Sequence, residues 1–186
     1  MYPVNFEPFV GKDYHTQSPK LLILGESHYG LESDTLGKNF TNFVVRKYAK
    51  RETGETRRFF TLIAKTVDRK LDNQTALELW DKVAFYNYVQ VLVGDGPRTR
   101  PTDQMFNQSN DAFRQVIDQL KPDILIVLGR RLGWHLDYFE EDFAPFLSNV
   151  IQCRWYHPST PRYFKAHQAV EALETARQQF YQRSSV

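Results

Sequence analysis

The sequence has little cysteine, no long apolar run and no excess of charge of one sign, and each lack excludes a class of protein. Its 186 residues include one cysteine, Cys153, which excludes an internal disulfide, a four-cysteine zinc site and an iron–sulfur cluster held by this chain alone. No apolar run approaches the roughly 20 residues that span a bilayer. The formal net charge is only +2, so any contact with nucleic acid must come from a local patch.

Several familiar signatures are also missing. The first fifteen residues have neither a basic start nor an apolar block, so we expect no secretory signal and a cytoplasmic protein. There is no Gly-x-Gly-x-x-Gly motif, P-loop lysine, His-Glu-x-x-His, Cys-x-x-Cys or Gly-x-Ser-x-Gly. These absences argue against a dinucleotide fold, a nucleoside triphosphatase and a compact zinc motif, and we expect no metal and no cofactor.

The composition that remains is that of one globular domain over residues 1–186. Hydrophobic residues make up 41% of the chain and charged residues 25%, which excludes disorder along most of it. Aromatic residues are abundant at 15%, which suits either an aromatic core or stacking surfaces for flat ligands.

Short apolar runs and amphipathic stretches alternate along the chain. Continuous apolar runs are typical of strands covered on both faces. The predicted strands are Leu21–Leu24, Lys82–Gln90, Ile124–Leu128 and Val150–Tyr156. The predicted helices are Leu36–Lys50, Arg57–Lys70, Gln104–Leu120, Arg130–Tyr138 and Tyr163–Tyr181. This order predicts an α/β protein, a three-layer α/β/α sandwich with a four-stranded, mostly parallel sheet.

Polar residues follow the ends of these strands. Glu26, Ser27 and His28 follow the first, Asn87 lies near the end of the second, and His157 follows the fourth. Ligands bind outside the carboxyl ends of parallel strands, so we expect these side chains to converge. The alternative is that loops are simply polar. Asn87 is the least expected of the group, because Asn is depleted in strands.

The segments LLILGESHYG, VAFYNYVQ, KPDILIVLG and WYHPST occur in the order and approximate spacing of one family. Over roughly residues 20–164 the chain resembles the uracil-DNA glycosylase superfamily. That resemblance implies an α/β/α fold with a four-stranded parallel sheet, and a pocket for a base extruded from DNA.

The resemblance also implies roles for individual residues. Glu26 and Ser27 would lie beside the sugar, and His157 would stabilise the leaving base as an anion. The roles in base binding would fall to His28, to Phe40 (with Phe43 as the alternative stacking ring) and to Asn87, which would read the base edge. Ser159 would hold a phosphate, and Arg162 would fill the gap or contact phosphate.

Two positions depart from the family pattern. Ser27 stands where the most active relatives have an aspartate that helps to orient water, and a neutral hydroxyl cannot take a proton. His28 stands where they have a proline. We expect His28 and His157 to face each other as a pair that changes charge near pH 6–7. Branches with the Gly-Glu start often carry an iron–sulfur cluster, which this chain cannot hold.

Several candidate residues could instead have a purely structural role. Glu26 could instead cap a helix, Phe40 could belong to the core, and His135 and His167 are expected to be surface or packing residues. Arg98, Arg100, Arg130 and Arg131 are the candidates for a phosphate patch.

We therefore expect a protein that binds an extruded or free nucleobase and hydrolyses the N-glycosidic bond of a damaged base in DNA. One alternative is a non-catalytic nucleotide- or nucleic-acid-binding module with the same fold. Another is a small-molecule hydrolase or transferase that acts on a free nucleoside or phosphate compound. The expected partner is DNA or a nucleotide rather than a membrane.

Overall fold

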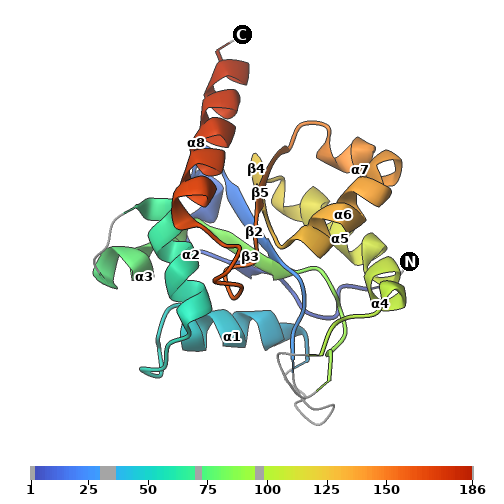
Figure 1. Cartoon of the computed structure of the whole chain (residues 1–186), viewed down its shortest axis with the longest axis horizontal. Helices are drawn as coiled ribbons and strands as arrows, with labels where there is room; N and C mark the ends of the chain where they lie inside the picture. The colour runs from blue at the N-terminus through green and yellow to red at the C-terminus, as the bar shows by residue number, and fades with distance from the viewer. Residues whose placement is uncertain (1–2, 30–36, 70–72, 95–98, 186) are drawn as a thin grey trace.

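The chain folds as an α/β protein around one mixed sheet (Figure 1). The computed structural model describes residues 3–29, 37–69, 73–94 and 99–185. The strands are β1 (Phe9–Val10), β2 (Leu21–Gly25), β3 (Ala84–Asn87), β4 (Ile124–Leu128) and β5 (Ile151–Trp155). Their order across the sheet is β1-β3-β2-β4-β5, with β1 antiparallel to β3 and the other neighbours parallel.

Helices cover both faces of this sheet. The α-helices are α1 (Phe40–Tyr48), α2 (Arg58–Asp68), α3 (Asn73–Lys82), α4 (Asp103–Gln108), α5 (Asn110–Leu120), α6 (Arg130–Tyr138), α7 (Glu140–Leu147) and α8 (Ala166–Arg183). Short 3-10 turns lie at Tyr14–Thr16 and Gly37–Asn39. The first three helices and α8 pack on one face, and α4 to α7 on the other (Figure 1). None of the helices in the described part of the chain is both long and apolar enough to cross a bilayer.

The alternation of side chains along each strand explains the two cores. In β2, Leu22 and Leu24 enter the core under α4 to α7, whereas Ile23 enters the opposite core under α1, α2, α3 and α8. Every residue of β2, β3 and β4 is buried, as expected for strands covered on both faces.

The prediction of four strands is wrong by one, because Phe9–Val10 pairs antiparallel with β3 at the edge. Two residues are too few to show a periodic pattern. The fourth predicted strand is also less enclosed than expected. In β5, Gln152 and Arg154 are exposed, because β5 forms the other edge of the sheet.

The predicted helices differ from the structure in three places. Gln104–Leu120 is two helices that meet at Ser109, whose backbone continues as αR while its hydroxyl bonds to the carbonyl of Met105. Helix α3 was not predicted. Helix α7, which begins with three acidic residues, was not predicted either. Those carboxylates lie in the first turn of α7, where a helix N-terminus favours negative charge.

Candidate functional site

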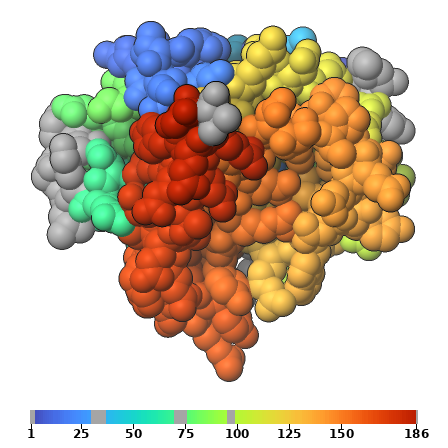
Figure 2. Space-filling view, turned by 90° about the horizontal axis from the view of Figure 1, so that it is seen from above, coloured from blue at the N-terminus to red at the C-terminus, as the bar shows by residue number. Residues whose placement is uncertain are grey.

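The carboxyl ends of the four parallel strands open into one large pocket. The pairing of Gly25 with Asn87 and of Leu128 with Trp155 brings these ends to the same edge of the sheet. The pocket has a volume of about 1410 Å³. In Figure 2 the segment after β5 projects beside the start of α6, and these two segments supply one wall of the pocket.

Most of the predicted site residues line this pocket. They are Glu26, Ser27, His28, Phe40, Asn87, Arg100, His157 and Ser159. Phe43, Arg130 and Arg131, which were secondary candidates, line it as well. Arg162 does not; its guanidinium lies 5.5 Å from the centroid of the Tyr163 ring. Arg98 lies outside the described residues.

Backbone pairing beyond the strand ends holds the segment that follows β2. The amides of Tyr88 and Val89 donate to the carbonyls of Gly25 and Glu26, each at 2.9 Å, and the amide of Val93 donates to the carbonyl of His28 at 2.9 Å. The residues after β2 and β3 therefore form one continuous wall.

Asn87 is fixed from two sides. Its Nδ2 lies 3.1 Å from Nδ1 and 3.2 Å from Nε2 of His28. A Cβ added at Gly25 would lie 2.1 Å from Asn87 Oδ1, so only glycine leaves room for the amide there. Asn87 is buried in the pocket wall, and these contacts set its orientation.

His28 is a buried, neutral imidazole. Nε2 lies 2.9 Å from the hydroxyl of Thr41, and the ring packs edge-on against Phe40 and Phe6. Burial lowers its pKa to about 3. The expectation of a His28–His157 pair that titrates near pH 6–7 is wrong for His28, because burial away from water disfavours the protonated ring.

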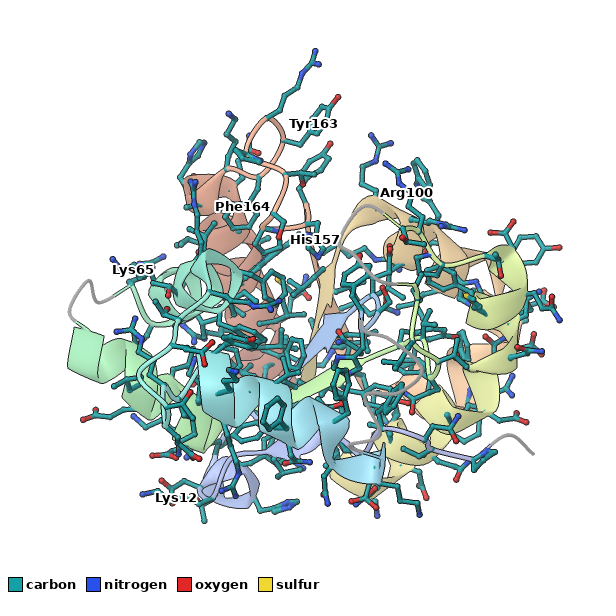
Figure 3. All side chains as sticks on the ribbon, turned by 90° about the horizontal axis from the view of Figure 1, so that it is seen from below. Lys12, Lys65, Arg100, His157, Tyr163 and Phe164 are labelled. Carbon is teal, nitrogen blue, oxygen red and sulfur yellow. The ribbon has the colours of Figure 1, made fainter. Side chains whose placement is uncertain are left out.

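His157 presents a donor. The backbone amide of Ser159 donates to Nδ1 at 3.2 Å, so the neutral ring carries its proton on Nε2. The imidazole stacks on Phe59, with centroids 5.3 Å apart and planes at 22°. Burial lowers its pKa, which keeps the ring neutral at pH 7. Figure 3 shows His157 between two sides of the opening, with Tyr163 on one and Arg100 on the other.

Glu26 is the only carboxylate among the described lining residues. Burial raises its pKa, and the charges of Arg131 and Arg100 oppose that rise. Ser27, its neighbour, has a buried hydroxyl with no hydrogen-bond partner among the described residues. The pocket lining thus includes a carboxylate, on Glu26, and a hydroxyl without a hydrogen-bond partner among the described residues, on the next residue, Ser27.

Cationic side chains line the pocket. The lining includes Arg57, Arg100, Arg130 and Arg131, of which Arg131 is paired with Asp103 at 2.8 Å. With Arg131 paired, three arginines stand against one carboxylate, so the pocket is cationic in a chain of net charge +2. Within the described residues, no group of three His, Cys, Asp or Glu is arranged to hold a metal ion.

Several lining residues were not predicted as part of the site. Phe59 and Arg57 come from the start of α2, and Trp134 and Tyr156 come from α6 and the end of β5. No local signal marks them, because each belongs to an ordinary amphipathic helix or strand end. Only the packing of α2 and α6 against the strand ends brings them to the pocket.

The function of the pocket must be inferred from these side chains. No protein-family model and no curated protein matches this chain.

Proposed function

We propose that this protein binds one nucleobase of DNA in the pocket and hydrolyses the N-glycosidic bond of a damaged base, in the manner of the uracil-DNA glycosylase superfamily that its sequence resembles. The observation that carries the proposal is the shared lining: Glu26, Asn87 and His157, from three different strand ends, face one pocket. These are a carboxylate, an amide and a neutral imidazole donor.

Each group suits one part of the reaction. Asn87 and the phenylalanine rings of the pocket bind a flat heterocycle through its edge and its faces. His157 Nε2–H donates to a carbonyl of the base as negative charge develops there. The arginines around the opening bind the phosphates of the same strand.

The bonds broken and formed in this hydrolysis balance without a cofactor. The bond from C1′ to the base nitrogen breaks, and its electron pair stays on the base, which leaves as an anion held by His157. The oxygen of a water molecule bonds to C1′, and Glu26 accepts the proton that the water loses. Because its pKa is raised, the Glu26 carboxylate is a stronger base than an ordinary glutamate, which suits the role of general base.

A second candidate is a non-catalytic module that binds nucleotide or nucleic acid. Ser27 favours it, because a neutral hydroxyl stands where the most active members of that superfamily have an aspartate. Arginines and aromatic walls would serve binding equally well without hydrolysis.

The test is release of free base from oligonucleotides that contain uracil, hypoxanthine or xanthine. We expect His157→Ala to reduce release by about 100-fold or more, and Glu26→Gln by a similar factor. His167→Ala is the matched control, because His167 is exposed on α8 and away from the pocket lining. Release that survives His157→Ala contradicts the mechanism. Binding of oligonucleotide with no release from any of the three selects the second candidate.

A further inference from the structure

The wall of the pocket formed by α6 and the segment after β5 carries exposed aromatic rings. Trp134 is 58% exposed, Tyr156 39% and Tyr163 52%. Single exposed aromatic residues are ordinary on a protein surface, but a contiguous set beside a cavity indicates an interaction site.

These rings stack in one row with two arginines. The Arg130 guanidinium lies 4.6 Å from the centroid of Trp134 and 5.9 Å from that of Tyr156. Tyr156 and Tyr163 stack with centroids 5.9 Å apart and planes at 21°, and the Arg162 guanidinium lies 5.5 Å from Tyr163. We call Trp134, Arg130, Tyr156, Tyr163 and Arg162 the stacked row.

Contacts within the stacked row restrain its exposed side chains. Cation–π and ring–ring contacts hold its members to one another, so little side-chain entropy remains to be lost on binding. Four of its members also line the pocket, so the row leads from the surface to the cavity. Arg57 and Arg100 line the same pocket, and no ion pair of either is seen among the described residues.

We propose that the stacked row is a platform for unpaired bases and that the partner of this protein is a single-stranded nucleic acid. This inference rests on the proposed function for the base in the pocket and adds the strand that carries it. Exposed rings stack on the faces of unpaired bases, which a duplex hides, while the arginines bind the phosphates.

The experiment measures the affinity of the protein for labelled oligothymidylates of increasing length, for a duplex of the same length and for thymidine monophosphate. We expect affinity to rise over several nucleotides and to be higher for the single strand than for the duplex. Trp134→Ala and Tyr163→Ala should each weaken binding of the longer strands by about 5- to 100-fold and leave the mononucleotide nearly unaffected. Tyr138→Ala is the matched control, since Tyr138 is 84% exposed on α6 but is not among the residues that line the pocket.

The proposal is overturned if the duplex binds at least as tightly as the single strand, or if both ring variants bind the longer strands like the unaltered protein. A loss in Tyr138→Ala equal to that in Trp134→Ala also overturns it. Base release reports on the proposed function separately. Strand binding that depends on Trp134, without base release, would retain the platform and reject hydrolysis. Base release that is unchanged in Trp134→Ala and Tyr163→Ala would retain hydrolysis and reject the platform.

Discussion

At the scale of single residues, Asn87 illustrates how a side chain is oriented by its neighbours. Its amide is held between the backbone of Gly25 and the ring of His28. A buried amide must have hydrogen-bond partners, and His28 can accept a hydrogen bond from the Asn87 amide only while the imidazole is neutral. The depressed pKa of His28 therefore supports the orientation of Asn87.

Gly25→Ala is expected to displace Asn87. The added Cβ would lie 2.1 Å from Asn87 Oδ1, a distance that the tightly paired β2 and β3 cannot relieve. We expect a stability loss of about 1–3 kcal/mol and weaker binding of a uracil-containing single strand. Urea denaturation and fluorescence anisotropy measure the two effects.

Gly133→Ala serves as the control for that substitution. Its Cβ would lie 3.1 Å from Nη1 of Arg154, which also donates to the Gly133 carbonyl and to Asp137, and a shift of a few tenths of an ångström in this side chain relieves the contact. Alanine also favours the helix. We expect little change in either measurement. Wild-type affinity in Gly25→Ala would show that the position of Asn87 does not matter for the ligand.

At the scale of elements, α2 supports the loop that follows β5. Phe59 stacks on His157, and the turn after the strand is closed by the amide of Thr160, which donates to the carbonyl of His157 at 2.9 Å. The two segments are about a hundred residues apart in sequence, so this contact exists only in the folded chain.

Phe59→Ala should change the titration of His157. Removal of the ring admits water to the imidazole, so the pKa of His157 should rise toward its ordinary value of 6.5. Titration of the His157 ring protons by NMR measures the shift directly and requires no activity. Any base release should decrease at the same time.

The control for Phe59→Ala is Phe146→Ala, which removes a phenylalanine that is 39% exposed on α7 and is not among the residues that line the pocket. It should leave the titration of His157 unchanged. A His157 pKa that is the same with and without Phe59 would show that burial by other groups keeps the imidazole neutral.

At the scale of the whole molecule, charge is unevenly distributed. The net charge of +2 predicts little attraction for nucleic acid, yet four arginines line one pocket. The proposed attraction for a nucleic acid is therefore local, and it depends on which cations the fold gathers rather than on their number in the sequence.

The salt dependence of binding should reveal these local contacts. For a single strand, log K falls with log salt by about 0.7 for each phosphate neutralised. We expect Arg57→Ala and Arg100→Ala each to reduce that slope by about this amount. Arg46→Ala is the control, because Arg46 is exposed on α1 and paired with Glu52. Equal slopes in all three variants would place the phosphates elsewhere.

Acid should destabilise the molecule through His28, which is buried, and His135, which is half-buried. Burial lowers the pKa of His28 to about 3 and that of His135 to about 4, against 6.5 for an ordinary histidine. Below pH 6.5 the unfolded chain binds protons that the folded chain does not, so stability is greatest above pH 6.5 and falls as the pH drops toward 3. For His28 the loss between pH 7 and pH 4.5 is on the order of 3 kcal/mol. The raised pKa of Glu26 acts in the opposite direction.

Urea denaturation at a series of pH values measures this loss, and His28→Gln isolates its main source. Glutamine keeps a hydrogen-bonding group near Thr41 and Asn87 but does not titrate. The stability of the His28→Gln variant should therefore depend less on pH between 6.5 and 4.5 than that of the unaltered protein. An unchanged pH dependence in His28→Gln would assign the acid lability to other groups.

Much of the scaffold follows from local pattern. The three fully buried strands and the amphipathic helices α2, α5, α6 and α8 are marked by apolar runs and helical spacing, which arise from burial on two faces or one. Strand β1, helix α3 and the break at Ser109 were not predicted, because a short edge strand and a helix junction depend on what packs beside them.

The sequence by itself determined the polar ends of the parallel strands, and with them Glu26, Asn87 and His157, since chain direction places those ends on one edge. Only the tertiary structure decided that His28 is enclosed by Phe6, Phe40 and Thr41, so that it stays neutral instead of titrating near pH 6–7. It also assembled the stacked row from α6 and the segment after β5. Protonation and stacking depend on distances in space, which spacing along the chain does not encode.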